Sequence, residues 1–381
     1  MAGIYLHIPF CKQACTYCNF HFTTSQRHKN EFVKAIIKEI DLQKDFLRNE
    51  SIATIYFGGG TPSLLTIEEA CLVLEKIKKE FSLEKNIEIT FEANPDDISK
   101  EKLLGWKDIG INRLSIGIQS FFEEDLVWMN RAHNQQQAYK CIEDSLAAGF
   151  DNISIDLIYG SHLLSDERWE KNIATSSINY KIPHLSCYAL TVEEKTPLHK
   201  QILLKKTVDV DSDKQARHFM ILMEKLKQNG YEHYEVSNFA MPGFRSRHNS
   251  SYWQGKKYLG LGPSAHSYDG IIRKWNVANN IKYIESINKG VVESETEVLT
   301  ETQKFNEYIM ISLRTKEGLN LETIKTNWGE DKLTTMKRRL EKFKEHNLVN
   351  AAGTTIQLTN EGMLMADGIA SDLFVTPTSR V

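Results

Sequence analysis

The sequence predicts an α/β fold, an open and partial barrel of six strand–helix units followed by a smaller C-terminal α+β module. Short β-rich runs alternate with amphipathic helical stretches at intervals of about thirty residues, which is typical of right-handed βαβ units in a parallel sheet. Six units are fewer than the eight that a closed barrel needs. The chain of 381 residues is long enough for one large domain and an appendage.

The expected elements of the barrel follow from these runs. We expect strands over residues 3–8, 53–57, 86–91, 113–118, 152–158 and 184–190. We expect helices over residues 28–47, 67–81, 99–107 and 165–178, with further helical segments up to residue 148. Because active sites of such barrels form where the strands end, polar residues just after each run are the candidate site.

The C-terminal part has a different pattern. Helical periodicity covers residues 300–314, 321–327 and 332–346, a short strand covers 354–358, and a last helix ends at 373. Helices followed by a small β element indicate a winged-helix-like domain. We therefore divide the chain into a barrel core at 1–240, a connecting segment at 241–298 and a C-terminal domain at 299–381.

Charge and composition narrow the class of protein. Lys and Arg number 47 against 50 Asp and Glu, and no Arg-rich set marks the winged-helix-like part, so we expect no nucleic-acid partner. The N-terminus lacks a basic n-region and a cleavage site, and no apolar stretch has the length of a bilayer span. Cys71, Cys141 and Cys187 lie singly in apolar patterns and are expected in the core. These features predict a cytoplasmic protein.

The most informative stretch is Cys11-Lys-Gln-Ala-Cys15-Thr-Tyr-Cys18, directly behind the first expected strand. Thiolates select zinc, Cu(I) or iron–sulfur clusters. A 4Fe–4S cluster normally takes four thiolates, so three leave one iron with an open position for a substrate or cofactor. The alternatives are three loop cysteines without a function, or a zinc site completed by His7 or His21.

The C-x3-C-x2-C spacing resembles the signature of the radical S-adenosylmethionine (SAM) superfamily. That resemblance implies a 4Fe–4S cluster whose unique iron binds the amino and carboxylate groups of SAM. The turn Gly58–Gly60 can hydrogen-bond the amino-acid end of SAM, because glycine lets backbone groups approach a ligand closely. The polar residues after later strands can bind its ribose, carboxylate or adenine: Glu92, Gln119, Arg131 and Asp156. Each has a plainer alternative, as a strand-to-helix turn, a cap, a salt bridge or a buried structural acid.

Four longer motifs are similar to those of the oxygen-independent coproporphyrinogen III oxidase family. They are Tyr5-x-His7-Ile-Pro-Phe-Cys11, Gly58-Gly-Gly-Thr-Pro-Ser63, Arg113-x-Ser-x-Gly-x-Gln-Ser120 and Asp156-Leu-Ile-Tyr-Gly160. The resemblance extends along nearly the whole chain and implies a partial (β/α)6 radical SAM barrel. It implies Cys11, Cys15 and Cys18 as cluster ligands. It implies SAM contacts at Tyr5, Tyr17, Gly59, Gly60, Thr61, Glu92, Gln119, Arg131 and Asp156.

Three features separate the chain from the oxidase itself and favour a heme-chaperone branch of the family. Phe20 stands where the oxidase has a further Cys, and only ten residues precede Cys11. The stretch Arg247-His248-Asn249-Ser-Ser-Tyr252-Trp253 matches the H-N-x-x-Y-W motif of that branch. Two positions depart from the branch pattern, His162 after the Gly160 turn and the pair Pro263-Ser264, and both affect only local loop shape.

The motif is chemically suited to heme. The resemblance implies heme contacts at His248, Asn249, Tyr252 and Trp253. His is the common axial ligand of heme iron, aromatic rings can stack on a porphyrin, and Arg245 and Arg247 can meet its propionates. The alternatives are a surface loop without heme, or an axial ligand at His7, His233 or His266.

Two functions follow, and they belong to different classes. The first is a chaperone that binds heme and transfers it to an acceptor protein that the sequence does not name, with a SAM-bound 4Fe–4S cluster. With this hypothesis we also expect a homodimer and a peripheral contact with membrane-bound acceptors. The alternative is an enzyme, an oxygen-independent coproporphyrinogen III oxidase that decarboxylates propionates by radical hydrogen abstraction. Phe20 and the H-N-x-x-Y-W motif favour the first.

Overall fold

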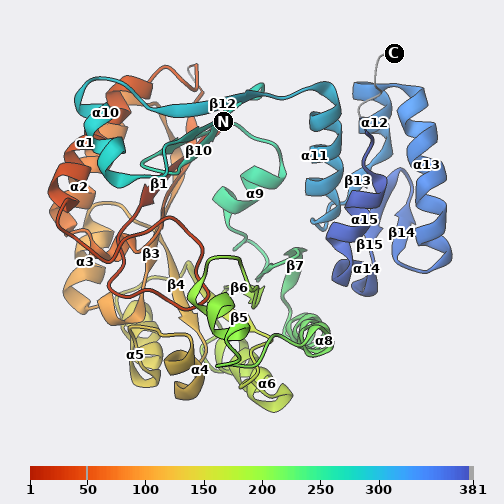
Figure 1. Ribbon diagram of the computed structural model, residues 1–381, viewed down its shortest axis with the longest axis horizontal. Helices are drawn as coiled ribbons and strands as arrows, with labels where there is room; N and C mark the ends of the chain where they lie inside the picture. The colour runs from red at the N-terminus through yellow and green to blue at the C-terminus, as the bar shows by residue number, and fades with distance from the viewer. Residues whose placement is uncertain (49, 377–381) are drawn as a thin grey trace.

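Six parallel strands form the centre of the molecule, as expected (Figure 1). The computed structural model describes residues 1–48 and 50–376. The strands are β1 (Ala2–Ile8), β2 (Ile52–Gly59), β3 (Leu83–Ala93), β4 (Arg113–Gln119), β5 (Ile153–Tyr159) and β6 (His184–Ala189). The helices between them are α1 (Lys29–Gln43), α2 (Ile67–Glu80), α3 (Lys100–Asp108), α4 (Glu123–Trp128), α5 (Gln135–Ala147) and α6 (Asp166–Ala174). The predicted α/β partial barrel is confirmed.

The two faces of this curved sheet differ in chemistry because side chains alternate along each strand. On β1, Ile4 and Leu6 are fully buried and belong to the apolar cluster that the outer helices cover. The intervening Tyr5 and His7 belong to the opposite, inner face. The same alternation on the other strands lines the inside of the barrel with polar groups, which is where a polar cofactor can be held.

The sheet continues past both ends of the parallel core. In the described residues it has twelve strands, in the order β12-β11-β10-β9-β1-β2-β3-β4-β5-β6-β8-β7. The added strands are β7 (Glu232–Glu235), β8 (Asn238–Ala240), β9 (Tyr258–Leu261), β10 (His266–Tyr268), β11 (Ile272–Asn276) and β12 (Ser294–Val298). Only β9 runs parallel to its neighbour, β1. Sequence reasoning missed these strands because they span only three to five residues each.

A buried carboxylate ties the β9–β11 region to the barrel. Glu39 on α1 accepts hydrogen bonds from the Gly262 backbone at 2.8 Å, the Asn276 amide at 2.7 Å and the Tyr283 hydroxyl at 2.5 Å. Burial raises the pKa of Glu39, and the hydrogen bonds act against that rise. The segment that follows residue 257 is thus held against the core by polar contacts that no sequence pattern predicted.

The C-terminal domain has the element order of a winged helix, and that part of the fold prediction is confirmed. Its elements are α11 (Glu301–Leu313), β13 (Leu319–Asn320), α12 (Leu321–Trp328), α13 (Glu330–Glu345), β14 (Val349–Ala352), β15 (Thr355–Leu358), α14 (Asn360–Leu364) and α15 (Ala366–Leu373). The three strands pair antiparallel in the order β13-β15-β14. The domain has its own apolar core, which includes Phe305, Leu340 and Ile369.

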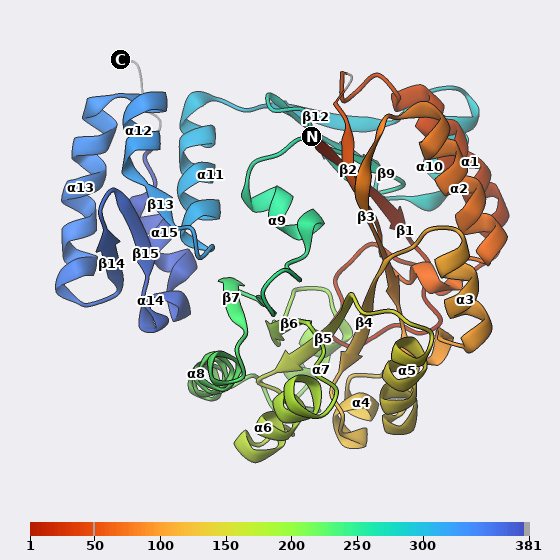
Figure 2. The ribbon, with the colours of Figure 1, turned by 180° about the vertical axis from the view of Figure 1, so that it is seen from behind.

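This domain contacts both edges of the large sheet, as Figures 1 and 2 show from opposite sides. Near one edge, Arg273 of β11 pairs with Glu307 of α11. At the other edge, Lys316 donates its backbone N–H to Tyr234 of β7 at 3.0 Å, and Val236 donates to Arg314 at 3.0 Å. The C-terminal domain therefore lies across the open side of the partial barrel.

Some local expectations need correction. The predicted last helix is two helices, α14 and α15, that meet at Met365. Helix α6 ends at Ala174 and continues as a π-helical turn over Thr175–Asn179. Cys141 and Cys187 are buried, but Cys71 is only half-buried on α2. No helix in the described part of the chain is both long enough and apolar enough to cross a bilayer. The domain limits at residues 240 and 298 stay predictions, and residues 377–381 lie outside the described range.

Candidate cofactor site

The three motif cysteines line one cavity of about 430 Å³ at the carboxyl ends of the parallel strands. The loop that carries them is held by backbone hydrogen bonds from Cys11 to Thr23 at 3.0 Å and from Thr16 to Met129 at 3.0 Å. This loop is thus closed between Cys11 and Thr23 and contacts the chain just after α4. The cavity is a single place where Cys11, Cys15 and Cys18 can act together.

Most of the predicted SAM residues line the same cavity. They are Tyr17, Gly59, Gly60, Thr61, Glu92, Gln119, Arg131 and Asp156. They come from the cysteine loop, the ends of β2, β3 and β4, the chain after α4, and β5. Tyr5 is the exception, because it stacks on Tyr56 and His248 and does not line the cavity.

The geometry does not favour the alternative of a zinc site. In the described residues, no three His, Cys, Asp or Glu side chains are grouped as ligands of one metal ion. His7 is buried and hydrogen-bonds the carbonyl of His21 at 2.8 Å, and His21 bonds Asn280 at 2.7 Å. Ligands of a single ion converge on one point, whereas the thiolates of a cubane are spread over its separate irons. Both histidines that could complete a zinc site thus make other polar contacts.

A buried guanidinium provides positive charge beside the thiols. Arg131 donates to Cys15 Sγ at 3.3 Å and to Asn94 and the Gly117 carbonyl at 2.7 Å each, while its buried Nε has no partner among the described residues. Burial by itself lowers the pKa of Arg131, but the neighbouring Tyr17 and Cys15 raise it above its ordinary value. A fixed cation here can stabilise cluster thiolates or the carboxylate of a bound ligand.

Burial favours the protonated form of two of the thiols, Cys11 and Cys18. Burial raises the pKa of Cys11 to about 11, against a hydrogen bond from the Thr61 hydroxyl at 3.5 Å. Burial also raises the pKa of Cys18. Because only the thiolate is a metal ligand, binding of a cluster would release these protons.

Two acids line the cavity from β3 and β5, the strands on either side of β4. Burial raises the pKa of Glu92 to about 7, and the Tyr56 hydroxyl, which donates to Glu92 at 2.7 Å, acts against that rise. Burial raises the pKa of Asp156 to about 6, and Ser186 and Arg131 act against it. Carboxyl groups with raised pKa values near neutrality suit hydrogen bonding to hydroxyl groups or a cation of a ligand.

The backbone is shaped for close approach at two turns. Gly59 has a φ of 105°, and a Cβ there would lie 2.6 Å from the His7 ring. A Cβ on Gly60 would lie 2.7 Å from the Phe10 carbonyl oxygen. Gln119 has a φ of 66°, an uncommon left-handed conformation for a residue with a side chain. Strained backbone of this kind gathers at ligand sites.

Sequence reasoning missed several residues that line this cavity. They include Tyr56, Asn94, Ser115, Gly117, Ser186 and Tyr188. All but Asn94 lie on β2, β4 or β6, and the pairs Ser115/Gly117 and Ser186/Tyr188 are each two positions apart on one strand. The period of two along a strand was the signal that would have found them.

The H-N-x-x-Y-W motif forms α9 (Arg247–Trp253), which packs against the start of β1 and β2. His248 is buried, and its ring nitrogens contact the Thr54 hydroxyl at 2.8 Å and the Tyr252 hydroxyl at 2.9 Å. Burial lowers the pKa of His248 to about 3. Ligation of heme iron by His248 therefore stays a prediction that requires one of these hydrogen bonds to break.

The other motif residues lie in different surroundings. Asn249 lines the cysteine cavity, whereas Trp253 packs under the Arg314 guanidinium of the C-terminal domain at 5.5 Å. Tyr252 uses its hydroxyl on His248. The motif as folded bridges the barrel interior, the cavity and the C-terminal domain, and these four side chains do not converge on one pocket.

The neighbouring charges and the alternative histidines are also placed. Arg245 pairs with Glu232 and Glu317 at the domain boundary, and Arg247 donates to the Asn86 carbonyl. His233 bonds the Val236 carbonyl and stacks on Phe239. His266 is exposed and stacks on Trp275.

Comparisons with known proteins agree with this geometry. Residues 5–174 match the Radical SAM superfamily, and residues 299–365 match the HemN C-terminal domain. The chain is 31% identical to the heme chaperone HemW of Bacillus subtilis over 97% of its length and 98% of that protein. It is 31% identical to HemW of Mycobacterium tuberculosis, over 97% of this chain and 94% of that one. HemW of Lactococcus lactis is 35% identical, over 84% and 83%.

A solved structure matches along almost the entire chain. Coproporphyrinogen III oxidase (HemN) from Escherichia coli, described as a radical SAM enzyme, superposes with a TM-score of 0.84, over 98% of this chain and 90% of that one. The sequence identity in that superposition is 22%, so it speaks for the fold alone.

Proposed function

The chain belongs to the HemW family within the radical SAM superfamily, and on that premise we propose that it binds heme and transfers it to an acceptor protein. The observation that carries this proposal is the likeness, over almost the full length of both chains, to proteins named heme chaperones. Membership of the superfamily implies a 4Fe–4S cluster and SAM. The cavity supports that part of the proposal, because three thiols and a set of polar strand-end residues line it together.

In this proposal, residues of the cavity bind the cluster and SAM in the following roles. Cys11, Cys15 and Cys18 would hold the cluster, which supplies an iron with an open position and a source of single electrons. The backbone at Gly59 and Gly60 would accept the amino-acid end of SAM. Glu92 and Asp156 line the cavity from the two strands that flank β4 and would receive polar groups such as ribose hydroxyls.

Arg131 would keep the site positively charged before and after SAM binds. Its guanidinium is already fixed by Asn94 and the Gly117 carbonyl, so little side-chain entropy is lost when a further anion arrives. It also contacts Cys15 and Tyr17, which joins the cluster side of the cavity to the SAM side. Tyr5, His248, Asn249, Tyr252 and Trp253 stay predicted contacts of SAM or heme.

In this proposal the protein works in the cytoplasm. A homodimer and a peripheral contact with a membrane-bound acceptor stay predictions. Phe20, with 67% of its surface exposed at the cavity, is the position where the resemblance implies a Cys in the oxidase. The oxidase activity is therefore an outcome to be tested and not the proposed function.

One sample can test the proposal. The protein is reconstituted anaerobically with iron and sulfide, assayed for both elements, and titrated with heme while the Soret band is followed. The same preparation is incubated with coproporphyrinogen III, SAM and a reductant, and the products are separated. We expect a Soret band, heme release to an added apo-hemoprotein, and no protoporphyrinogen.

The matched variant is Cys11→Ser, which removes one cluster ligand. It is expected to lose the cluster and to bind SAM more weakly. Formation of protoporphyrinogen by the parent protein would assign it to the oxidase. If the reconstituted protein does not bind heme, the chaperone proposal is wrong. If the protein contains tetrahedral zinc and no sulfide, both the chaperone and the oxidase hypotheses are wrong.

A further inference from the structure

Asn94, a residue without a role in the sequence predictions, lies between the hydrogen-bond donors of two predicted cluster ligands. It follows β3 directly and is half-buried in the wall of the cysteine cavity. Its amide nitrogen donates to the Thr61 hydroxyl at 3.1 Å, and its amide oxygen accepts from Arg131 Nη2 at 2.7 Å. Arg131 can only donate, so the amide oxygen must face it and the amide nitrogen must face Thr61. One side-chain amide thus joins these two donors.

The contact with Asn94 fixes the direction of the Thr61 hydroxyl. A hydroxyl has a single hydrogen to donate and accepts through its lone pairs. Because Thr61 Oγ1 accepts from the Asn94 amide, its hydrogen is left for the sulfur of Cys11, which lies 3.5 Å away. Thr61 has only 3% of its surface exposed, so little water can compete for that hydrogen.

The same amide fixes the direction of the Arg131 guanidinium. Both hydrogens of Nη2 are used, by the Asn94 oxygen and by the Gly117 carbonyl, at 2.7 Å each. The guanidinium is a planar fork, so the direction of Nη2 also sets that of Nη1. Nη1 is the nitrogen that donates to Cys15 Sγ at 3.3 Å. Without Asn94, the contact with Gly117 would be the one left to hold Nη2, and the fork would be free to turn about it.

Other contacts hold the loop that carries the cysteines. On one side, Lys12 forms an ion pair with Asp96 at 2.7 Å. On the other side, the Thr16 hydroxyl donates to the Trp128 carbonyl at 3.4 Å. The Thr16 carbonyl accepts the N–H of Leu198, on α7 (Pro197–Leu203), at 2.8 Å. The position of the loop therefore does not depend on the Asn94 side chain.

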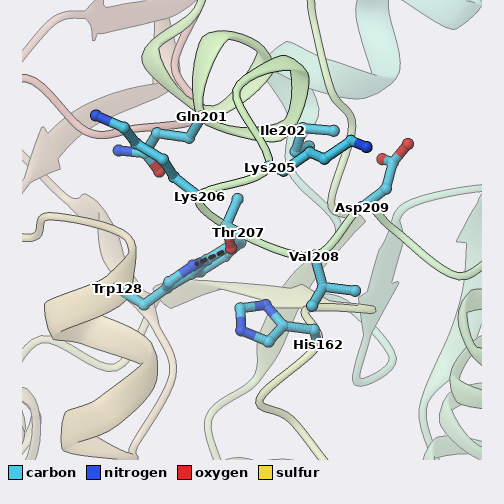
Figure 3. A pocket seen from close by; sticks show the side chains of 9 residues that line it. All are labelled: Trp128, His162, Gln201, Ile202, Lys205, Lys206, Thr207, Val208 and Asp209. Carbon is cyan, nitrogen blue, oxygen red and sulfur yellow. Dashed lines mark hydrogen bonds between the residues drawn. The ribbon is translucent and has the colours of Figure 1, made fainter.

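Trp128, which provides one of these contacts, is itself held from a separate cavity of about 730 Å³ between the end of α4 and the segment after α7 (Figure 3). There the Trp128 ring donates to the Thr207 hydroxyl at 3.1 Å, as the dashed line shows. Among the described residues, this cavity and the cysteine cavity share no lining residue. A change at Asn94 therefore leaves this anchor of the loop in place.

From these contacts we propose that Asn94 is a positioning residue of the iron–sulfur site, which acts through Thr61 and Arg131 to aim hydrogen bonds at the sulfurs of Cys11 and Cys15. This role rests on the proposed function, since it requires a 4Fe–4S cluster on these cysteines. Hydrogen bonds to the ligand sulfurs are one of the factors that set the reduction potential of such clusters. Donors at the sulfurs stabilise the additional negative charge of the reduced state, so the bonds that Asn94 aims raise the reduction potential.

The test measures the reduction potential of the reconstituted full-length protein without SAM, by titration with dithionite and mediator dyes followed by electron paramagnetic resonance. Asn94→Leu removes both amide hydrogen bonds at similar volume. It should lower the potential by about 59 mV or more, which is a tenfold change in the equilibrium of a one-electron couple. Asn94→Ser is too short to reach either partner and should lower the potential equally.

The matched control is Asn19→Leu. Asn19 lines the same cavity, is exposed, and makes no side-chain hydrogen bond among the described residues, so the potential should not change. Thr61→Val deletes one hydroxyl and should lower the potential by itself. Combined with Asn94→Leu, it should lower the potential by less than the sum of the two single changes, because Asn94 acts partly through that hydroxyl. Iron and sulfide contents should match those of the parent protein in every variant.

A potential of Asn94→Leu equal to that of the parent protein would overturn this role, and so would strictly additive effects of Asn94→Leu and Thr61→Val. Loss of the cluster from both Asn94 variants would also overturn it, because Asn94 would then support the loop and not aim its donors. If the parent protein assembles the cluster but does not bind heme, the chaperone function is wrong, and the measured potentials alone decide the role of Asn94. If the parent protein assembles no cluster, the role of Asn94 and the cluster part of the proposed function are both wrong.

Discussion

The substitution Glu92→Gln is expected to increase the stability of the folded protein and to weaken its binding of SAM. Glu92 lies half-buried at the cavity with a pKa of about 7, raised from 4.5 chiefly by burial. At about 1.4 kcal/mol per pKa unit, keeping this carboxylate ionised in the folded protein costs about 3 kcal/mol. Since the side chain faces a solvent-accessible cavity, screening reduces this cost to about 1–2 kcal/mol.

The sign of the pH dependence follows from the direction of the shift. The unfolded chain ionises at its ordinary pKa of 4.5, whereas the folded protein resists ionisation until about pH 7. The parent protein therefore loses stability relative to the Gln variant as pH rises between these values, and the difference is complete above about pH 7. The amide oxygen can still accept the hydrogen bond from Tyr56, so little else changes.

The assay is urea unfolding of the reconstituted, SAM-free protein, followed by tryptophan fluorescence. We expect Glu92→Gln to be more stable than the parent by about 1–2 kcal/mol at about pH 8 and nearly equal to it at about pH 5. SAM binding should weaken about tenfold at the higher pH, because a neutral amide replaces a charged acceptor. Glu101→Gln, an exposed carboxylate on α3, serves as the matched control and should change neither quantity.

A second variant tests the cause of the shift. Asp156 also raises the pKa of Glu92 by its charge. Asp156→Asn should therefore move the stability transition of Glu92 to lower pH. If Glu92→Gln destabilises the protein equally at both pH values, the carboxylate makes net favourable contacts in the folded state, and the reasoning from burial is refuted.

Three other predictions concern positions away from this acid. His248→Ala should lower the free energy of unfolding by about 3 kcal/mol, because it leaves a cavity and two unpaired hydroxyls. The difference between variant and parent should shrink below about pH 6.5, because the folded parent protein keeps His248 neutral and is destabilised where the unfolded chain protonates it. Gly117→Ala places a Cβ 3.1 Å from Arg131, so SAM affinity should fall about tenfold with little change in melting temperature. Gly260→Ala places a Cβ 2.0 Å from the backbone oxygen of His266, so the loss of packing between β9 and β10 should lower the melting temperature by several degrees, at about 2–4 °C per kcal/mol.

Each of these has a result that would contradict it. An unchanged urea midpoint for the His248 variant would mean that α9 is not held by its histidine. If the Gly117 variant has a lower melting temperature but an unchanged SAM affinity, the added Cβ disturbs the core and not the cavity. A Gly260 variant as stable as the parent would show that β10 can move away from β9 at no cost.

The alternation of strands and helices was readable from the sequence because it depends on local periodicity. Apolar residues at intervals of two or of three to four select a strand or a helix within a few neighbouring residues. The cysteine loop was equally readable, since Cys11, Cys15 and Cys18 are close in the chain and any fold of that loop keeps them near each other. The polar ends of the parallel strands then met at one edge, as βαβ topology requires.

Only the tertiary structure decided what the remaining residues do. Nothing local distinguishes His248, whose ring nitrogens contact Thr54 and Tyr252, from His162, whose ring Nδ1 has no hydrogen-bond partner among the described residues. Tyr5 matched a motif but does not line the cavity, and it stacks instead on Tyr56, which does. The surroundings of such side chains are set by segments distant in sequence, so burial, partners and pKa values arise only when those segments pack together.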